Sequence, residues 1–339
     1  MSTDVSTTAA LGGVSGLIDG TPVIDLRRLG SSRAGPIGPA PKSRTRTSFL
    51  AGVIRTARPK QWSKNVLVLA APASAGVLTS QNSLARALVA FGTFCLVASG
   101  TYFLNDALDT ESDRSHPTKR YRPVAAGVIS VPAAMAIGIS LMGAALAGGG
   151  LLSWKLGLVL AIYVGVQFAY SYYLKHQPVY DLASVASGFV LRAIAGAVAV
   201  RVPISEWFLI VATFGSLLMV TGKRLGEYRE LGEERGSHRS SLEAYSPSFL
   251  RCVLAVAAAG AIIGYCIWAL SLSHPGTRHY STFWCQISIA PIFVALLKYA
   301  YLVERGEGAK PEDLVMGNRS LQVLGVVWLA TFSAGIYAG

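Results

Sequence analysis

The chain alternates between long apolar stretches and short polar segments over most of its length. Nine stretches long enough to cross a bilayer, which takes about 20 mostly apolar residues, lie between positions 65 and 338. They occupy residues 65–80, 84–105, 130–152, 156–174, 181–200, 205–222, 249–272, 281–303 and 320–338. The segments between them are too short to build a soluble domain with its own core. The pattern predicts an all-α integral membrane protein whose function lies in its helices and loops.

The N-terminal part of the chain has a different composition. Residues 1–47 are rich in Ser, Thr, Gly, Pro and Arg and have too little apolar surface to offset the entropy lost on ordering, so we expect a disordered cytoplasmic tail. From Phe49 to Lys64 apolar and basic residues are interleaved, which is typical of a helix in the membrane interface. We therefore expect a transmembrane catalytic domain at 48–339 that begins with a short interfacial helix.

The charges agree with a membrane protein and predict its orientation. Only 14% of the residues are charged, against about 25% in soluble domains. With the N-terminus inside, 25 of the 30 Lys and Arg fall in or beside cytoplasmic segments, as the positive-inside rule requires. This distribution accounts for most of the net charge of +12, and no aromatic platform for bases accompanies it, so we expect no nucleic-acid partner. We expect a multi-pass plasma-membrane protein with a cytoplasmic active site.

The segment at the cytoplasmic end of the second stretch holds the clearest chemical signal. Asn105, Asp109 and Asp113 are spaced four residues apart, which places them on one helical face, and Asp106 lies three residues before Asp109. Carboxylates gathered in this way repel one another unless a cation lies among them. Oxygen ligands suit a hard divalent ion, and Mg²⁺ takes one or two carboxylates together with substrate phosphate oxygens. The alternative, a helix end with solvated acids, is less favourable at a membrane boundary.

A cationic run follows these acids directly. It consists of His116, Lys119, Arg120 and Arg122, bracketed by Pro117 and Pro123. Alone, such a run would indicate only a cytoplasmic loop. After four oxygen ligands it indicates the second half of an anion site, in which Lys and Arg bind phosphate groups that the metal leaves uncovered.

Two patterns in this region resemble a known family. The pattern N-D-x-x-D-x-x-x-D at 105–113, in a chain with nine apolar stretches, resembles the UbiA superfamily of intramembrane prenyltransferases. The segment R-P-K-Q-W-S-K-N at 58–65, together with H-P-x-K-x-x-R-P at 116–123, resembles one branch, the decaprenyl-phosphate phosphoribosyltransferases. The resemblance covers the chain from about Phe49 to its end and leaves the tail uncovered.

The resemblance implies a fold and a reaction. The fold is a nine-transmembrane-helix bundle around a central cavity that opens to the cytoplasm and laterally to lipid. The reaction transfers 5-phosphoribose from phosphoribosyl diphosphate to decaprenyl phosphate, or another polyprenyl phosphate, and releases diphosphate. It is a step towards the arabinan of the cell wall. Mg²⁺ is the expected cofactor, with Asp106, Asp109 and Asp113 as catalytic residues, and a homo-oligomer such as a trimer is compatible with the family.

Further candidate residues lie at the other cytoplasmic segments. Members of the superfamily usually carry a second D-x-x-x-D after the fourth span, but Asp181 is followed here by Val185, which argues against a two-metal prenyl-diphosphate site. Asp181 has an alternative role as a helix N-cap. Arg192, alone in an apolar stretch, is expected to face the interior and to bind phosphate or pair with an acid. The predicted substrate-binding residues are Lys64, Asn105, Lys119, Arg120, Arg122, Tyr170, Lys175, Asp181, Arg192, Lys223, Arg224 and Arg239.

The mechanism and its alternatives follow from the same residues. The lipid phosphate is already anionic, so the transfer needs no strong general base, and the sequence shows no Ser/His/Asp or Cys/His arrangement near the clusters. Prenylation of an aromatic acceptor such as a quinone precursor would fit a second acid pair, which this chain lacks. A transporter would place polar groups near the bilayer midplane, whereas these acids lie at its edge. The loop at 304–319 shows no converging pattern, and we expect no chemistry there.

Overall fold

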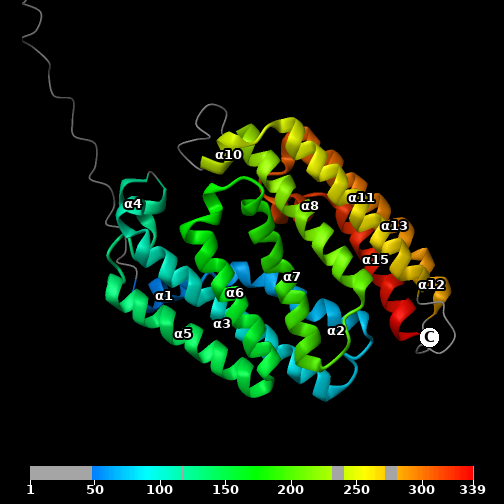
Figure 1. The fold of residues 1–339 in the computed structure, drawn as a ribbon, viewed down its shortest axis with the longest axis horizontal. Coiled ribbons are helices and arrows are strands. Elements are labelled where there is room, and N and C mark those ends of the chain that lie inside the picture. Colours follow the sequence, from blue (N-terminus) through cyan, green and yellow to red (C-terminus); the bar gives the residue numbers. More distant parts are fainter. Residues whose placement is uncertain (1–47, 117, 231–239, 272–280, 339) are drawn as a thin grey trace, which may run out of the picture. The chain divides into compact units, whose positions relative to one another are not determined.

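The computed structural model describes residues 48–116, 118–230, 240–271 and 281–338, which form a bundle of helices (Figure 1). These ranges contain no β-strand, so the predicted all-α architecture is confirmed. The predicted disordered tail at 1–47 lies outside the described residues.

The helices differ widely in length, and 3₁₀ segments join several of them. The first half of the chain forms α1 (Phe49–Ala57), η2 (Pro59–Leu69), α2 (Ala70–Ser74), α3 (Gln81–Leu108), α4 (Thr110–Ser115), η3 (Lys119–Tyr121), α5 (Val131–Leu152), α6 (Trp154–Tyr172) and η4 (Leu174–His176). The second half forms α7 (Tyr180–Val200), α8 (Glu206–Glu230), α10 (Ser240–Ala244), α11 (Pro247–Ser271), α12 (Thr282–Ile287), α13 (Ile289–Leu302), η6 (Val303–Glu307), α14 (Pro311–Gly317) and α15 (Arg319–Tyr337).

Eight helical segments in the described ranges are long and apolar enough to cross a membrane, α12, α13 and η6 counting as one. They correspond to eight of the nine predicted stretches. The first predicted stretch, 65–80, differs because it holds only the end of the 3₁₀ helix η2 and the short helix α2. Gly76 follows α2 with a φ of 66°, a left-handed conformation that glycine adopts readily and that ends helices.

The helix α7 connects two apolar cores. Ala195 in α7 packs with Phe94 of α3 and Leu160 of α6 in one core. Leu182, near the other end of α7, packs with residues of α8 and α11 such as Leu225 and Leu250. Figure 1 shows the same division, with α3, α5 and α6 on one side of α7 and α8, α11, α13 and α15 on the other. Because α7 belongs to both cores, residues along it can join groups from the two halves.

Large apolar side chains also cover the outside of the long helices. Ile139, Leu158, Ile263 and Val326 expose more than half of their surface. In water such a surface would be unfavourable, whereas lipid tails solvate it well. Together with the eight spanning segments, it identifies a multi-pass membrane protein.

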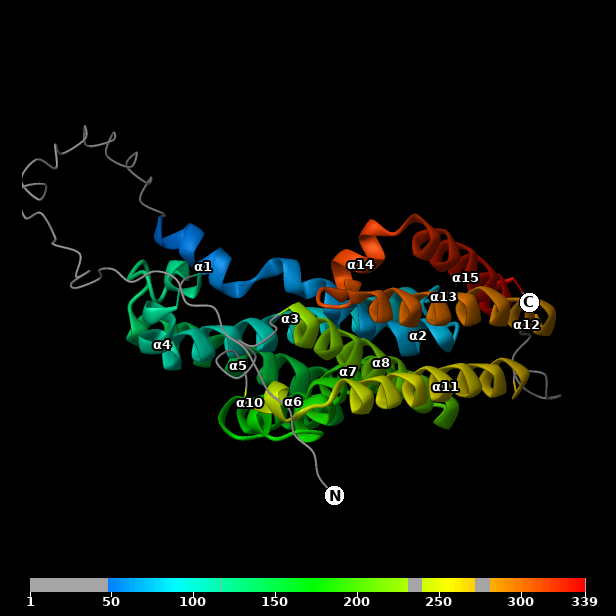
Figure 2. The same ribbon diagram turned by 90° about the horizontal axis from the view of Figure 1, so that it is seen from above.

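The predicted helix before the first apolar stretch is present as α1. The Ser48 side chain caps it by accepting a hydrogen bond from the backbone N–H of Ala51 at 3.2 Å. Phe49 and Leu50 are exposed, while Gly52 is buried against Val128 and Ile129. Figure 2 shows α1 on the same side of the bundle as α4. Its position in the membrane interface stays a prediction.

A test of the packing is available where η2 crosses α7. Gly196 lies so close to η2 that an added Cβ would overlap the carbonyl oxygen of Val68. Because backbone cannot move aside as a side chain can, Gly196→Ala is expected to destabilise the protein by about 1–3 kcal/mol or more. Thermal unfolding in detergent measures the effect. Gly165→Ala is the matched control, since open space surrounds that position in α6, and alanine favours helix there. Equal melting temperatures for the two variants would contradict the close crossing.

Candidate active site

Two buried aspartates share one arginine where α3 ends. Asp106 lies in the last turn of α3 and Asp113 lies in α4, and their exposed fractions are 1% and 2%. Nη1 of Arg122 donates to Oδ1 of Asp106 at 3.2 Å and to Oδ2 of Asp113 at 2.7 Å. The two aspartates come from successive helices and are seven positions apart in the sequence. Their carboxylates meet at the guanidinium of Arg122.

Arg58 completes the cluster, although it is not among the predicted site residues. Its Nη2 donates to Oδ1 of Asp106 at 2.6 Å, and its guanidinium lies 4.6 Å from the centre of the Tyr102 ring. It joins α1 to η2 with a φ of 53°, which is unusual for a residue other than glycine. Its place at the head of the R-P-K-Q-W-S-K-N segment was the signal in the sequence. Arg58 and Arg122 thus balance the charges of the two buried aspartates.

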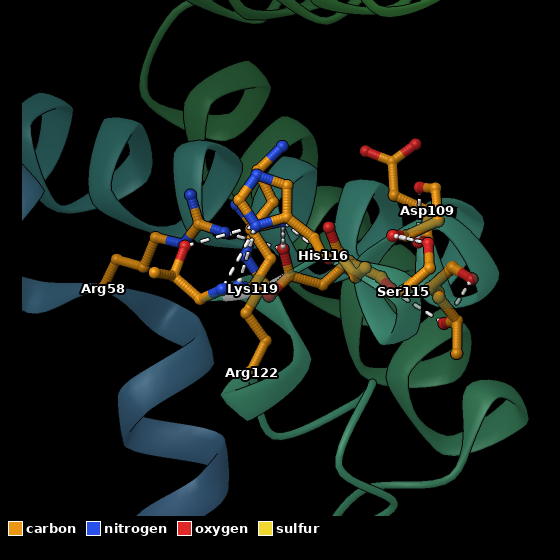
Figure 3. A network of polar contacts seen from close by, with 12 residues as sticks. Arg58, Asp109, Ser115, His116, Lys119 and Arg122 are labelled. Carbon is orange, nitrogen blue, oxygen red and sulfur yellow. Dashed lines mark hydrogen bonds and ion pairs between the residues drawn. The ribbon is translucent and has the colours of Figure 1, made fainter. Parts of the chain in front are cut away.

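The four predicted metal ligands have different partners, and their role as a metal site stays a prediction. Helix α3 ends before Asp109, whose exposed side chain lies apart from Arg58 and Arg122 in Figure 3. Oδ1 of Asn105 accepts a hydrogen bond from the Ser171 hydroxyl at 3.2 Å, away from the arginine cluster. Within the described ranges, no three Asp, Glu, His or Cys side chains form a metal-binding group. Asp109, the one residue between α3 and α4, has an exposed side chain, whereas Asp106 and Asp113 are buried.

The loop after α4 carries the predicted cationic run. Nδ1 of His116 accepts hydrogen bonds from the backbone N–H groups of Thr118 and Lys119, at 3.2 and 3.3 Å, and so stabilises the fold of this loop. Arg122 then faces the two aspartates, while Lys119 and Arg120 are exposed (Figure 3). One cation of the run therefore contacts the acids, and two stay available at the surface of the cluster.

A second buried ion pair joins α7 to α8. Nε and Nη2 of Arg224 donate to the two carboxylate oxygens of Asp181 at 2.7 and 3.1 Å, and both side chains are almost completely buried. The Tyr170 hydroxyl donates to Oδ1 of Asp181 at 3.2 Å, and Nη1 of Arg224 donates to Glu227 at 2.8 Å. The N-cap position of α7 belongs to Val179, so the alternative role of Asp181 as a helix cap is not observed.

Arg192 lies in a small cavity among η2, α3, α6 and α7. The cavity has a volume of about 130 Å³ and is lined by Lys64, Tyr102, Tyr163, Gln167, Tyr170, Ser184, Val185, Gly188, Phe189 and Arg192. Arg192 faces the interior as predicted and donates to Oδ1 of Asn65, the carbonyl of Gly188 and the Tyr163 hydroxyl. None of its contacts in the described part of the chain is an acid. Of the two alternatives, pairing with an acid is not observed in these residues, and binding of phosphate stays a prediction.

Lys64, on the wall of this cavity, has an acidic partner from a distant part of the chain. Its Nζ lies 2.8 Å from Oε1 of Glu312 in α14. Partial burial raises the pKa of the Glu312 carboxyl, but the hydrogen bond from Lys64 and the charges of Lys64 and Lys223 hold that pKa below its ordinary value. Glu312 is thus a carboxylate at neutral pH. One carboxylate of the segment 304–319 therefore lies beside the cavity wall, while the expectation that this segment carries no chemistry stays a prediction.

The remaining predicted residues are dispersed. Lys175 is half-buried in η4. Lys223 exposes 45% of its side chain and lies 3.7 Å from Glu227, so it can reach solvent ligands. Arg239 lies outside the described residues. The roles of these three side chains in substrate binding stay predictions.

The fold and the site together define an all-α membrane protein with charged clusters and a cation-lined cavity buried among its helices. The UbiA prenyltransferase family matches residues 66–322, and the chain belongs to this family. Its fold agrees with solved structures of the same family. A UbiA homologue from Archaeoglobus fulgidus bound to GPP and Mg²⁺ superimposes with a TM-score of 0.65, covering 85% of this chain and all of the other at 18% identity. A homologue from Aeropyrum pernix superimposes with a TM-score of 0.57 at 15% identity, covering 82% of this chain and 97% of the other.

Relatives with higher sequence identity carry a more specific name. The decaprenyl-phosphate phosphoribosyltransferase of Corynebacterium glutamicum is 43% identical over 295 residues, which are 84% of this chain and 87% of the relative. The protein of the same name from Mycolicibacterium smegmatis is 42% identical over 320 residues, which are 91% and 98% of the two chains. These alignments extend over nearly the whole of both relatives.

Proposed function

We propose that this protein transfers 5-phosphoribose from phosphoribosyl diphosphate to decaprenyl phosphate or a similar polyprenyl phosphate. An oxygen of the lipid phosphate forms a bond to the anomeric carbon of the ribose, and the bond from that carbon to the diphosphate breaks. The diphosphate leaves with the bonding electrons. The identity of 42–43% to relatives named for this reaction, over almost their full length, carries the proposal. As part of this proposal, the phosphoribosyl lipid is used to form the arabinan of the cell wall.

The buried aspartates fit a divalent cation. Asp106 and Asp113 direct carboxylate oxygens at one nitrogen of Arg122, so a positive charge already lies between them. Mg²⁺ accepts such ligands with water and phosphate oxygens. Asp106 and Asp113 would hold it, with Asn105 and Asp109 as further candidates if the segment around Asp109 rearranges. When bound, Mg²⁺ would neutralise charge on the leaving diphosphate.

The chain's own cations supply the rest of the anion site. Arg58 and Arg122 contact the aspartates through one nitrogen each, and a guanidinium has five donors. Their remaining N–H groups can bind diphosphate oxygens. Arg192 and Lys64 line one cavity and can bind a second phosphate, either the 5-phosphate of the donor or the lipid phosphate. The acceptor is anionic, so none of these residues has to remove a proton.

The orientation is part of the same proposal. We propose that the C-terminal ends of α3 and α8 lie on the cytoplasmic side of the plasma membrane, where a soluble sugar diphosphate is accessible; the asymmetry of Lys and Arg supports this orientation. The lipid tail would lie in the bilayer between helices whose outer faces are apolar.

An assay with purified protein tests the reaction. With labelled phosphoribosyl diphosphate, a polyprenyl phosphate and Mg²⁺, we expect a labelled phosphoribosyl lipid, and we expect chelation by EDTA to abolish its formation. A parallel reaction with geranyl diphosphate and an aromatic acid tests the alternative prenyl transfer. Formation of a prenylated product without any phosphoribosyl lipid would overturn the proposal in favour of that alternative.

A further inference from the structure

The salt bridge between Lys64 and Glu312 joins the cavity wall to the segment between α13 and α15. Lys64 lies in η2 and Glu312 in α14, and the two atoms that meet are 2.8 Å apart. In the described part of the chain, the other cation of the cavity, Arg192, contacts only neutral oxygens and aromatic rings. One of the two cations in the cavity is thus neutralised by a carboxylate and the other is not.

The salt bridge between Lys64 and Glu312 is exposed enough for another anion to replace Glu312. The Lys64 side chain is 29% exposed and that of Glu312 is 51% exposed. A pair with this exposure contributes little to stability, because water solvates both charges well. Phosphate has more negative charge than a carboxylate and more acceptor oxygens, so it forms the stronger charge-assisted hydrogen bonds with a lysine. A phosphate group that enters the cavity can therefore replace Glu312.

Only the Glu312 side chain has to move in such an exchange. The backbone just before α14 is packed against α8, since an added Cβ at Gly226 would overlap the backbone of Ala309. The Glu312 side chain itself is half-exposed and can turn into solvent. Lys223 lies in α8 three residues before Gly226, and its partly exposed ammonium group also acts on Glu312. The released carboxylate therefore keeps a cation nearby.

We propose that Glu312 is an internal counter-anion, which neutralises Lys64 in the substrate-free protein and gives way to a phosphate group of the substrate. The identity of that phosphate rests on the proposed function. Glu312 then sets the affinity of the cavity for its anionic ligand by competing for the same lysine. Because Glu312 gives way when the phosphate binds, we expect it to affect the affinity for that ligand and not the rate of the chemical step.

Binding measurements on the full-length protein test this competition. Glu312→Gln removes the charge and keeps the shape, and we expect it to bind phosphoribosyl diphosphate, inorganic diphosphate or a polyprenyl phosphate about two- to fivefold more tightly than wild type. The ligand that gains affinity identifies which phosphate Lys64 receives. In turnover, KM for that substrate is expected to fall while kcat stays within about twofold. Asp313→Asn, a neutralised acid on the next residue of the same helix, is the control and is expected to leave all three affinities unchanged.

Lys64 provides the second arm of the test. In a Lys64→Ala background, Glu312→Gln is expected to have no further effect on affinity, because the lysine for which the two anions compete is gone. The charge exchange Lys64→Glu with Glu312→Lys is expected to keep the melting temperature close to that of wild type but to weaken ligand binding, because the lysine no longer lies on the cavity wall. These results separate a competing anion from a pair that serves only the fold.

The outcomes that overturn the inference are distinct from those that overturn the proposed function. Unchanged or weaker binding of all three phosphates by Glu312→Gln, with wild-type binding intact, removes the competition and leaves the transfer reaction standing. A wild type that binds inorganic diphosphate but forms no phosphoribosyl lipid overturns the reaction, and the Glu312→Gln comparison still decides the inference. A wild type that binds none of the three overturns both.

Discussion

Replacing Asp113 with Asn is expected to lower turnover on the order of a thousandfold, since a metal-bound diphosphate draws several kcal/mol of its stabilisation from its ligands and each 1.4 kcal/mol is a factor of ten. Asp113 is buried and shares Arg122 with Asp106. The amide keeps the size of the side chain but removes the negative charge that holds a cation. The measurement is single-turnover transfer, together with the shift of the melting temperature on adding Mg²⁺, which we expect to be smaller in the variant.

Asp109→Asn is the informative comparison. Asp109 is exposed and lies outside the cluster, so in this arrangement its loss is expected to lower turnover less than the loss of Asp113. An equal loss would show that the segment rearranges when substrate binds and that the predicted four-ligand cluster forms then. Near-normal turnover of Asp113→Asn, by contrast, would remove the aspartate pair from the catalytic site.

Replacing Arg224 with Ala is expected to produce the largest loss of stability, about 3–5 kcal/mol. Asp181 is fully buried, and Arg224 supplies two of its hydrogen bonds. Without the guanidinium, the buried carboxylate loses these two hydrogen bonds and the positive charge that neutralises it. Thermal or denaturant unfolding in detergent micelles measures the loss.

Two further variants define the cause. Lys223→Ala removes the neighbouring cation, which is exposed and only weakly paired with Glu227, and is expected to change stability by less than about 1 kcal/mol. The double variant Arg224→Met, Asp181→Asn is expected to recover part of the stability lost in Arg224→Ala, because no uncompensated charge remains. Failure of the double variant to recover any would mean that packing, and not the ion pair, accounts for the loss.

The position of Arg224 also narrows the assignment of cations to phosphates. Two nitrogens of Arg224 donate to Asp181 and the third donates to Glu227. In the described part of the chain, by contrast, Arg192 contacts neutral groups only, and the partner of Lys64 is exchangeable. Arg192 and Lys64, which line the cavity, are therefore better placed to bind a phosphate than Arg224. The sequence alone placed Arg192, Lys223 and Arg224 together among the predicted substrate-binding residues.

The sequence determined the fold class and the general nature of the site. An apolar stretch of bilayer length must form a helix, because lipid offers no partner for backbone N–H and C=O groups, and eight of the nine predicted stretches are such helices. The exception, 65–80, contains a positive-φ glycine and a 3₁₀ segment, which hydropathy does not register. The acids at 105–113 and the cations at 116–122 are also local in sequence, so their proximity followed from the chain itself.

Only the tertiary structure decided which charges meet. Arg58 reaches Asp106 across 48 positions, Arg224 reaches Asp181 across 43, and Lys64 meets Glu312 from opposite ends of the domain. Helical periodicity relates residues within one helix, but it says nothing of which helix lies beside it or at what height. Even within 105–113, the two aspartates that share Arg122 are Asp106 and Asp113, a pair that the predicted spacing of four did not single out. In a low-dielectric interior, a charged side chain pairs with the opposite charge that the packing brings within about 3 Å. That packing depends on all the helices of the bundle together, so the sequence of one segment does not reveal the partner.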